Sequence, residues 1–244
     1  MDNISIVQIR KRAEQGITRP FLCQGDNGKW YWVKGHDAGK SSLCNEWIAG
    51  RIAQDFGLPI PPFVQAVVPE QLVKYSARDD ISELGDGIVF ASEHVEGAQE
   101  YNLSNLSHTP IILQRTTLVF DWWIQNDDRT LDEHGGNVNV LWLPEAKEAR
   151  IIDHNIAFDS SFSNDKLINK HVFKDALNNW EENFNLELEP IMLDISRKLE
   201  SYFAELPEEW TDSAKSLPEC SYNRMRAILN RFQNRNDLFR DNTL

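Results

Sequence analysis

The segment 126–153, NDDRTLDEHGGNVNVLWLPEAKEARIID, contains the pattern on which our fold prediction depends. Two short apolar runs flank a turn that begins at Pro144, so the segment predicts a β-hairpin. If the strands pair symmetrically about residue 146, Asn139 lies opposite Asp153 with both side chains on one face. Amide and carboxylate oxygens so placed suit Mg²⁺, which binds one or two carboxylates together with phosphate oxygens.

A helix is predicted to precede this hairpin. Pro110 opens it and the polar residues 126–129 end it, because proline fits a first helical turn and polar residues favour helix ends. Asp128 lies at this end of the helix, and its side chain would reach the same site as those of Asn139 and Asp153. The apolar face of the helix is formed by Leu113, Leu118, Val119, Trp122 and Trp123.

The first strands are predicted from a turn signal. Aromatic and apolar runs at 21–23 and 30–33 flank Asp-Asn-Gly at 26–28. Asn and Gly tolerate positive φ, so residues 18–34 predict a β-hairpin that ends at Lys34.

A second helix is predicted after this hairpin, with Ser41 or Ser42 as its cap and Glu46 close to its first turn. Strands are predicted at 61–68 and 87–92, so the order is β-β-α-β-β. The helix prediction rests on the helical spacing of Leu43, Trp47, Ile48, Ile52 and Phe56.

Three further amphipathic helices are predicted near 171–184, 190–206 and 221–235. The last one carries a basic region, which we interpret as a solvated helix face; the alternative is a contact to an acidic partner or to phosphate. This region contains Arg224, Arg226, Arg231, Arg235 and Arg240.

Five of these residues form the set that kinase-type phosphoryl transfer requires. In kinases a strand lysine holds the α- and β-phosphates and is held by a helix glutamate. An aspartate accepts the hydroxyl proton, and an asparagine and an aspartate hold the metal. The corresponding residues here are Lys34, Glu46, Asp128, Asn139 and Asp153.

The order and spacing of several short motifs resemble those of small HipA-like kinases, a branch of the protein-kinase and phosphoinositide-kinase superfamily. The resemblance covers residues 21 to about 158, and only loosely the helical carboxy-terminal part. The motifs are FL at 21–22, DNG at 26–28, VK at 33–34, NEWIAGRIA at 45–53, GLPIP at 57–61, ASE at 91–93, NDDR at 126–129, NVNVLW at 137–142 and IDH at 152–154.

The resemblance implies an α+β, two-lobed protein-kinase-like fold. Residues 1–95 would form a β-rich lobe and residues 96–244 a mainly helical lobe with the catalytic loop and the metal-binding hairpin. ATP and Mg²⁺ would bind between them. The turn with Gly25 and Gly28 would cover the nucleotide.

The resemblance also assigns roles to single residues. Lys34 would bind the phosphates and Glu46 would pair with it, while Asp128 would act as the catalytic base. Asp153 would be the main metal ligand. The second ligand is Asn139 or Asn137, and we prefer Asn139 because it adjoins the strand. The residues that would meet adenine through backbone groups are Glu93, His94 and Val95.

Two departures from the family pattern keep other functions open. Thr130 stands where the family has a histidine, and the loop that follows is longer. The main prediction is a kinase for Ser or Thr hydroxyls of an acceptor protein. One alternative is a nucleotide-binding pseudokinase or interaction module with an antitoxin-like partner. The other is a lipid or small-molecule kinase.

Composition excludes several classes of protein. The 244 residues are 41% hydrophobic, and the formal charge is 25 − 38 = −13, which disfavours direct nucleic-acid binding. No apolar run reaches the roughly 18–20 residues that span a bilayer, so no membrane partner is expected. The three cysteines, Cys23, Cys44 and Cys220, form no CxxC pair, which favours a reduced, cytoplasmic location.

Two other motifs are weaker. Residues 35–41, GHDAGKS, are one residue short of a phosphate-binding P-loop, so Lys40 is interpreted as a solvated loop residue. The spacing of His36, His134 and His154 matches no common zinc pattern.

Overall fold

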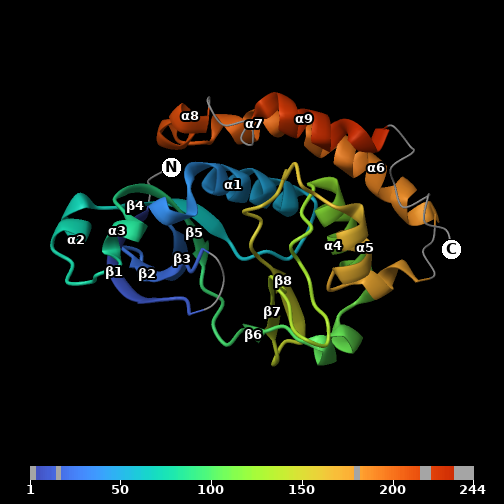
Figure 1. The fold of residues 1–244 in the computed structure, drawn as a ribbon, viewed down its shortest axis with the longest axis horizontal. Coiled ribbons are helices and arrows are strands. Elements are labelled where there is room, and N and C mark those ends of the chain that lie inside the picture. Colours follow the sequence, from blue (N-terminus) through green and yellow to red (C-terminus); the bar gives the residue numbers. More distant parts are fainter. Residues whose placement is uncertain (1–3, 15–17, 179–181, 215–220, 234–244) are drawn as a thin grey trace.

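Figure 1 shows the computed structural model of the chain, which describes residues 4–14, 18–178, 182–214 and 221–233. The fold is α+β, as predicted, with a barrel of strands at the left of the view and helices mainly along the top and at the right. Within these ranges no helix is long and apolar enough to cross a membrane. The strands are β1 (Ile4–Arg12), β2 (Phe21–Gly25), β3 (Trp30–Lys34), β4 (Phe63–Val68), β5 (Gly87–Glu93), β6 (Gln99–Glu100), β7 (Val140–Leu143) and β8 (Glu148–Ile151). The helices are α1 (Lys40–Asp55), α2 (Glu70–Lys74), α3 (Ile81–Leu84), α4 (Ile111–Trp123), α5 (Asn164–Lys170), α6 (Glu182–Arg197), α7 (Leu199–Ala204), α8 (Glu208–Ala214) and α9 (Tyr222–Asn230).

Five strands close into a barrel in the order β1-β2-β3-β5-β4, a closure that the sequence does not predict. Neighbouring strands are antiparallel, except that β1 and β4 run parallel. The predicted hairpin of β2 and β3 is confirmed. Tyr31 and Val33 of β3 fill the barrel. Because side chains alternate along a strand, Trp30, Trp32 and Lys34 lie on its outer face.

Strand β1 is missing from the sequence prediction, so the predicted order β-β-α-β-β is wrong at its start. β1 begins with apolar residues but ends in the cations Arg10, Lys11 and Arg12, which obscure the strand pattern. The connection that precedes β2 therefore joins two barrel strands and is not a free amino-terminal segment.

Helix α1 starts at Lys40, with Gly39 as its N-cap. The predicted serine cap is wrong, because Gly39 at φ 77° turns the chain directly into the helix and places Ser41 and Ser42 inside it. Glu46 consequently lies in the second turn of α1 and is buried.

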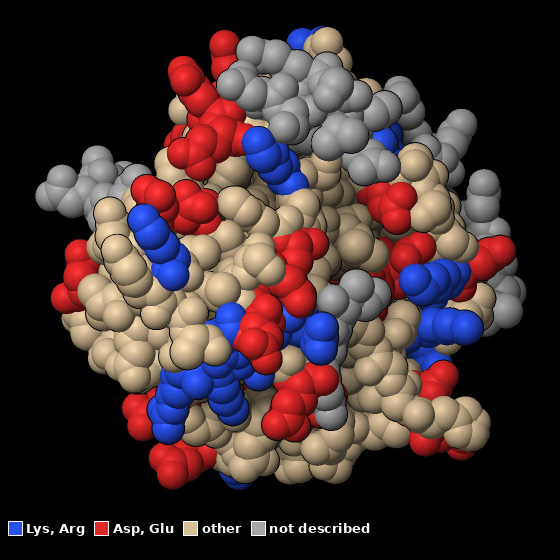
Figure 2. Space-filling model, turned by 60° about the vertical axis from the view of Figure 1, so that its left-hand side comes forward, with Lys and Arg blue, Asp and Glu red and all other residues tan. Residues whose placement is uncertain are grey.

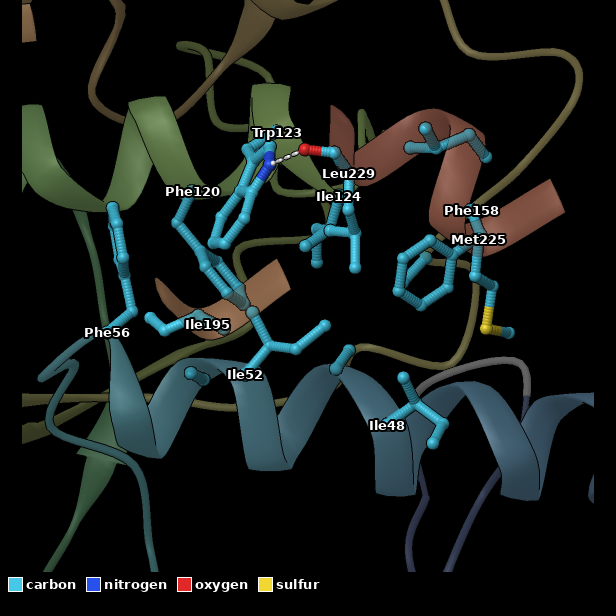
Figure 3. Close-up of a cluster of buried hydrophobic side chains, with 14 of the residues drawn as sticks. Ile48, Ile52, Phe56, Phe120, Trp123, Ile124, Phe158, Ile195, Met225 and Leu229 are labelled. Atoms are coloured by element: carbon cyan, nitrogen blue, oxygen red, sulfur yellow. Dashed lines mark hydrogen bonds between the residues drawn. The ribbon is translucent and has the colours of Figure 1, made fainter. Parts of the chain in front are cut away.

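The largest apolar core joins α1 to α4 and to the carboxy-terminal helices (Figure 3). Ile48 and Ile52 of α1 lie on one side of this core and Trp123 of α4 on the other. The indole N–H of Trp123 donates to the backbone oxygen of Leu229 in α9 at 2.9 Å. The core thus contains residues from both sides of residue 95. The predicted division of the chain into two lobes at that residue stays a prediction.

The hairpin of β7 and β8 forms, with β6 beside β7, but its register differs from the prediction by one residue. Leu143 pairs with Glu148, so the turn has four residues instead of five. Lys147 closes this turn at φ 55°. Asn139 therefore lies opposite Ile152, whose backbone N–H donates to the Asn139 oxygen at 3.1 Å, and not opposite Asp153.

The carboxy-terminal helices differ from the prediction at several ends. A continuous helix over 171–184 is wrong, since α5 ends at Lys170 and a 3-10 turn, Lys174–Leu177, follows. The helix predicted at 190–206 is divided into α6 and α7, and α8 was not predicted. Arg226 is exposed, as the interpretation as a solvated face expects. Arg224 and Arg231 are half-buried and donate to the backbone oxygens of Phe158 and of Trp123 at the end of α4. Cys220, Arg235 and Arg240 lie outside the described residues.

We expect Ile52→Ala to lower the free energy of unfolding by about 2–5 kcal/mol, because it opens a cavity in the core. Urea denaturation measures the change. Ile191→Ala in α6 is the matched control: Ile191 is 42% exposed, and its removal should change the stability by no more than about 0.5 kcal/mol. Equal losses in the two variants would contradict the central position of α1.

Candidate active site

A cavity of about 810 Å³ lies between the barrel and the β7–β8 hairpin. Trp32 and Lys34 of β3 contribute to one wall. Val140 and Ile151 of the hairpin contribute to another, and Asp153 lies just beyond the end of β8.

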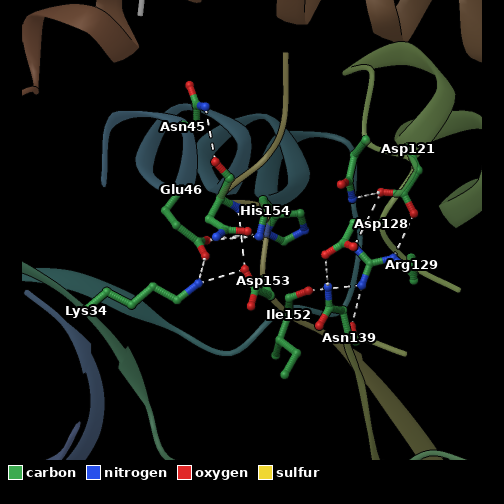
Figure 4. Close-up of polar contacts among 12 residues, drawn as sticks. Lys34, Asn45, Glu46, Asp121, Asp128, Arg129, Asn139, Ile152, Asp153 and His154 are labelled. Atoms are coloured by element: carbon green, nitrogen blue, oxygen red, sulfur yellow. Dashed lines mark hydrogen bonds and ion pairs between the residues drawn. The ribbon is translucent and has the colours of Figure 1, made fainter. Parts of the chain in front are cut away.

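Lys34, Glu46 and Asp153 meet at this cavity, although they come from three separate elements (Figure 4). The Nζ atom of Lys34 contacts Oε1 of Glu46 and lies 2.7 Å from Oδ1 of Asp153. The backbone N–H of His154 donates to Oε2 of Glu46 at 3.2 Å. Lys34 is only 7% exposed, so its ammonium depends on these carboxylates for compensation.

Asp128 lies in the loop after α4 and also lines the cavity. Its Oδ2 accepts hydrogen bonds from the side-chain amides of Asn137 and Asn139, the latter at 3.3 Å. The structure therefore brings both candidate asparagines to the candidate base, and the choice of metal ligand between them stays a prediction.

Asn139 directly precedes β7, and Asp153 follows β8, so both lie at the open end of the hairpin. Both have left-handed backbone conformations, with φ values of 48° and 60°. Asn and Asp tolerate this region better than most residues. Because both residues leave the regular strand geometry, their side chains reach the cavity without the direct pairing that the symmetric hairpin predicts.

Arg129 connects this loop to the hairpin and is completely buried. Its Nε donates to Oδ2 of Asp121 at 2.7 Å, and its Nη1 donates to the backbone oxygens of Asn139 and Ile152, the latter at 3.0 Å. Asp121 also accepts from Nε2 of His171 at 2.9 Å. The pKa of Asp121 is held well below its usual value: burial would raise it, but Arg129 and His171 outweigh that effect.

Sequence analysis missed these positioning residues, although one signal was available. Asp121 lies on the predicted helix between Phe120 and Trp122, both of which are buried. A carboxylate among core residues needs a buried cation or hydrogen-bond donor, and Arg129 in the adjacent loop was the nearest candidate.

The residues predicted at the nucleotide divide into two groups. Glu93, His94 and Val95 line the cavity. Gly25 and Gly28 are not among the lining residues, and their role in covering the nucleotide stays a prediction. The β1–β2 connection contributes instead, through Ala13, Thr18 and Pro20.

Comparison with known proteins identifies the family. The sequence profile of the HipA-like kinases matches residues 6–242. The chain belongs to the HipA-like kinase family. The crystal structure of the Helicobacter pylori proinflammatory kinase CtkA has a similar fold, with a TM-score of 0.51, 14% sequence identity and coverage of 93% of this chain and 92% of that one. No curated protein matches the chain.

In this HipA-like kinase, Thr130 has a local structural role. Its backbone N–H donates to the Asn137 oxygen at 2.8 Å, and its Oγ1 accepts from the Asn137 N–H at 3.3 Å. These bonds close the loop between the two residues and hold Asn137 beside Asp128. The loop between Thr130 and Asn137, although longer than in the family pattern, thus stays attached next to Asp128.

Two carboxylates share one ammonium at this cavity. Burial lowers the pKa of Lys34, but Asp153 and Glu46 outweigh it and raise the pKa above its usual value. Burial raises the pKa of Glu46 to about 7 despite the opposing effect of Lys34. Burial acts in the same direction on Asp153, but Lys34 outweighs it and lowers that pKa. Lys34 and Asp153 therefore stay charged, and Glu46 is the first of the three to take up a proton.

The donor set fits Mg²⁺ held partly by substrate. Asp153 and Asn139 each offer a side-chain oxygen at the cavity. Among the described residues, no group of three or more His, Cys, Asp or Glu side chains is placed to hold a metal ion. Mg²⁺ keeps several waters and usually binds one or two carboxylates plus phosphates, so the oxygens of Asp153 and Asn139 are suitable ligands for it.

Cations lie beside the cavity, although its lining is mainly acidic. The charged lining residues are Lys34 and the carboxylates of Glu46, Glu93, Glu100, Asp128 and Asp153. Figure 2 shows Lys and Arg side chains gathered in one area of the face that it presents. Burial lowers the pKa of His94, which lines the cavity; Lys11 and Arg10 lower it further, although Glu96 opposes them. Nearby cations of this kind attract anionic ligands.

We expect Asp121→Asn to lower the free energy of unfolding by about 3–5 kcal/mol, because it leaves the buried Arg129 without its counter-charge. The wild type should also lose stability as the pH falls below about 4, where unfolded aspartate takes up a proton and folded Asp121 does not. The variant should lose less over this range.

Denaturant titrations between pH 7 and pH 3 measure both effects. Asp194→Asn is the control, since Asp194 is an exposed residue in α6 whose ion pair with Lys198 is at the surface. It should behave like the wild type. An Asp121→Asn variant with wild-type stability at pH 7 would show that the pair does not hold the loop.

Proposed function

We propose that this HipA-like kinase uses ATP to phosphorylate Ser or Thr hydroxyls of an acceptor protein. The observation that supports this most is the buried contact of Lys34 with Glu46 and Asp153 at a cavity that Asp128 also lines. In this proposal residues 1–95 and 96–244 act as two lobes on either side of the nucleotide.

Lys34 binds the α- and β-phosphates in the proposed complex, and Glu46 keeps its ammonium in place. The backbone groups of Glu93, His94 and Val95 bind the base at the other end of the cavity. The chain thereby fixes both ends of the nucleotide before transfer, and catalysis comes mainly from positioning and from compensation of charge.

Asp128 accepts the proton of the acceptor hydroxyl as the hydroxyl oxygen bonds to the γ-phosphorus. The bond from the γ-phosphorus to the bridging oxygen breaks, and ADP leaves. Both asparagines donate to Oδ2 of Asp128, so we assign its Oδ1 to the hydroxyl. Burial and the neighbouring Asp153 raise the pKa of Asp128, which makes it a better base.

Asp153 and Asn139 would hold Mg²⁺, with Asn137 as the alternative to Asn139. When bound, the ion neutralises charge on the β- and γ-phosphates. The low pKa of Asp153 keeps this ligand ionised at neutral pH.

A second candidate is a nucleotide-binding pseudokinase that works through contacts with an antitoxin-like protein. The observation that favours it is the loop after Thr130, which holds Asn137 against Asp128 where an acceptor hydroxyl must approach. Nucleotide binding without transfer distinguishes this function from the first.

We expect Asp128→Asn to lower kcat by about 10²- to 10⁴-fold, because the variant lacks the general base. The melting temperature should still rise with Mg·ATP. Asp153→Asn should lose the magnesium-dependent part of that rise, since the metal loses its ionised ligand. Dephosphorylated casein serves as the acceptor, and mass spectrometry locates the phosphate.

Lys40→Ala is the control variant, because Lys40 is not among the residues that line the cavity. It should match the wild type in both assays. Wild-type turnover in Asp128→Asn would overturn the assignment of the base. Binding of Mg·ATP by the wild type with no phosphate on casein or on the chain itself would favour the pseudokinase.

A further inference from the structure

Trp32 has a position in the cavity that none of the assigned roles explains. It lies two residues before Lys34 on β3, so both side chains are on the same outer face of the barrel. Both line the cavity, whereas Trp30, on the same face two residues earlier, does not. Trp32 is therefore the aromatic side chain of β3 nearest to the phosphate-binding lysine.

Contacts on two sides fix the indole of Trp32. Its Nε1–H donates to Nδ1 of His94 at 3.2 Å, and the two rings meet edge to face with centroids 6.0 Å apart. The ammonium of Lys11 lies 5.9 Å from the centre of the indole. Nδ1 of His94 must be unprotonated to accept this bond. The lowered pKa of His94 agrees with that state.

Apolar side chains from other elements line the cavity together with Trp32. Phe63 and Phe90 line the cavity from the neighbouring strands β4 and β5, and Val140 and Ile151 line it from the hairpin. The carboxylates that contact Lys34, those of Glu46 and Asp153, line the same cavity. A ligand that fits this cavity has a flat ring that packs against the apolar side chains and a charged group that reaches Lys34.

We propose that Trp32 binds the base of the nucleotide by aromatic stacking and is the main side-chain determinant of base affinity. This inference rests on the proposed function, which places a nucleotide in the cavity. Two residues along a strand span roughly 6–7 Å, a separation that the ribose bridges between base and phosphates. The hydrogen bond to His94 holds the indole in place, so little side-chain entropy is lost on binding.

The test compares two ligands that differ in the base. Isothermal titration measures binding of Mg·ATP and of magnesium tripolyphosphate to the full chain and to its Trp32→Ala, Trp32→Phe and Trp30→Ala variants. Trp32→Ala should weaken Mg·ATP binding by about 5- to 150-fold, the range found when a stacked aromatic residue is removed. Its binding of tripolyphosphate should not change, because that ligand has no base.

The two other variants are matched controls. Trp32→Phe keeps an aromatic ring and should remain within a few-fold of the wild type, while Trp30→Ala should bind both ligands like the wild type. Mg·ATP should quench tryptophan emission in the wild type and in Trp30→Ala. This quenching should be largely lost in Trp32→Phe.

Several outcomes overturn the inference. Unchanged or tighter Mg·ATP binding by Trp32→Ala would mean that the indole does not stack on the base or that it obstructs the base. Equal weakening of both ligands would mean that the substitution disturbs the whole cavity. Failure of the wild type to bind Mg·ATP would overturn the proposed function itself, and the inference with it.

Discussion

A buried lysine ammonium must have counter-charges beside it, and this requirement determines how the parts of the structure meet. Lys34 ends a barrel strand, Glu46 lies inside α1 and Asp153 follows the β7–β8 hairpin. An unpaired charge at this depth would cost several kcal/mol, so the three elements must meet in one arrangement. The contact itself adds little net stability, because desolvation offsets much of the attraction. Its effect is to specify the geometry of the site, while the apolar core supplies the stability.

Arg129, which adjoins Asp128, is a second buried cation that needs a counter-charge. Arg129 is compensated by Asp121, and its Nη1 donates to the backbone oxygens of Asn139 and Ile152, the latter directly before Asp153. The two charge networks thus meet at the hairpin, one through a side chain and one through the backbone. Groups fixed in this way before substrate arrives need no reorganisation during the reaction, which is the main source of electrostatic catalysis.

Local signals in the sequence predicted much of this structure, and the failures have physical causes. The β2–β3 hairpin and the cores of α1 and α4 follow from turn chemistry and periodicity. The hairpin register could not be predicted, because it depends on a four-residue turn that Lys147 closes in a left-handed conformation. The Asp121–Arg129 pair leaves no periodic pattern. β1 was hidden by the cations at its end.

The position of α1 limits how the site can be controlled. Leu43, Ile48 and Ile52 are buried in the core that α1 shares with the carboxy-terminal helices. Each such side chain contributes about 1.5–3 kcal/mol by burial. Glu205, just beyond α7, adds an ion pair with Arg51 of α1 at 3.0 Å. Moving Glu46 away from Lys34 would therefore break the main core of the protein and not a surface contact. Regulation through the exposed part of the adjoining loop, residues 132–137, requires far less disruption. A few hydrogen bonds hold that part, whereas the buried Arg129 fixes the end that carries Asp128.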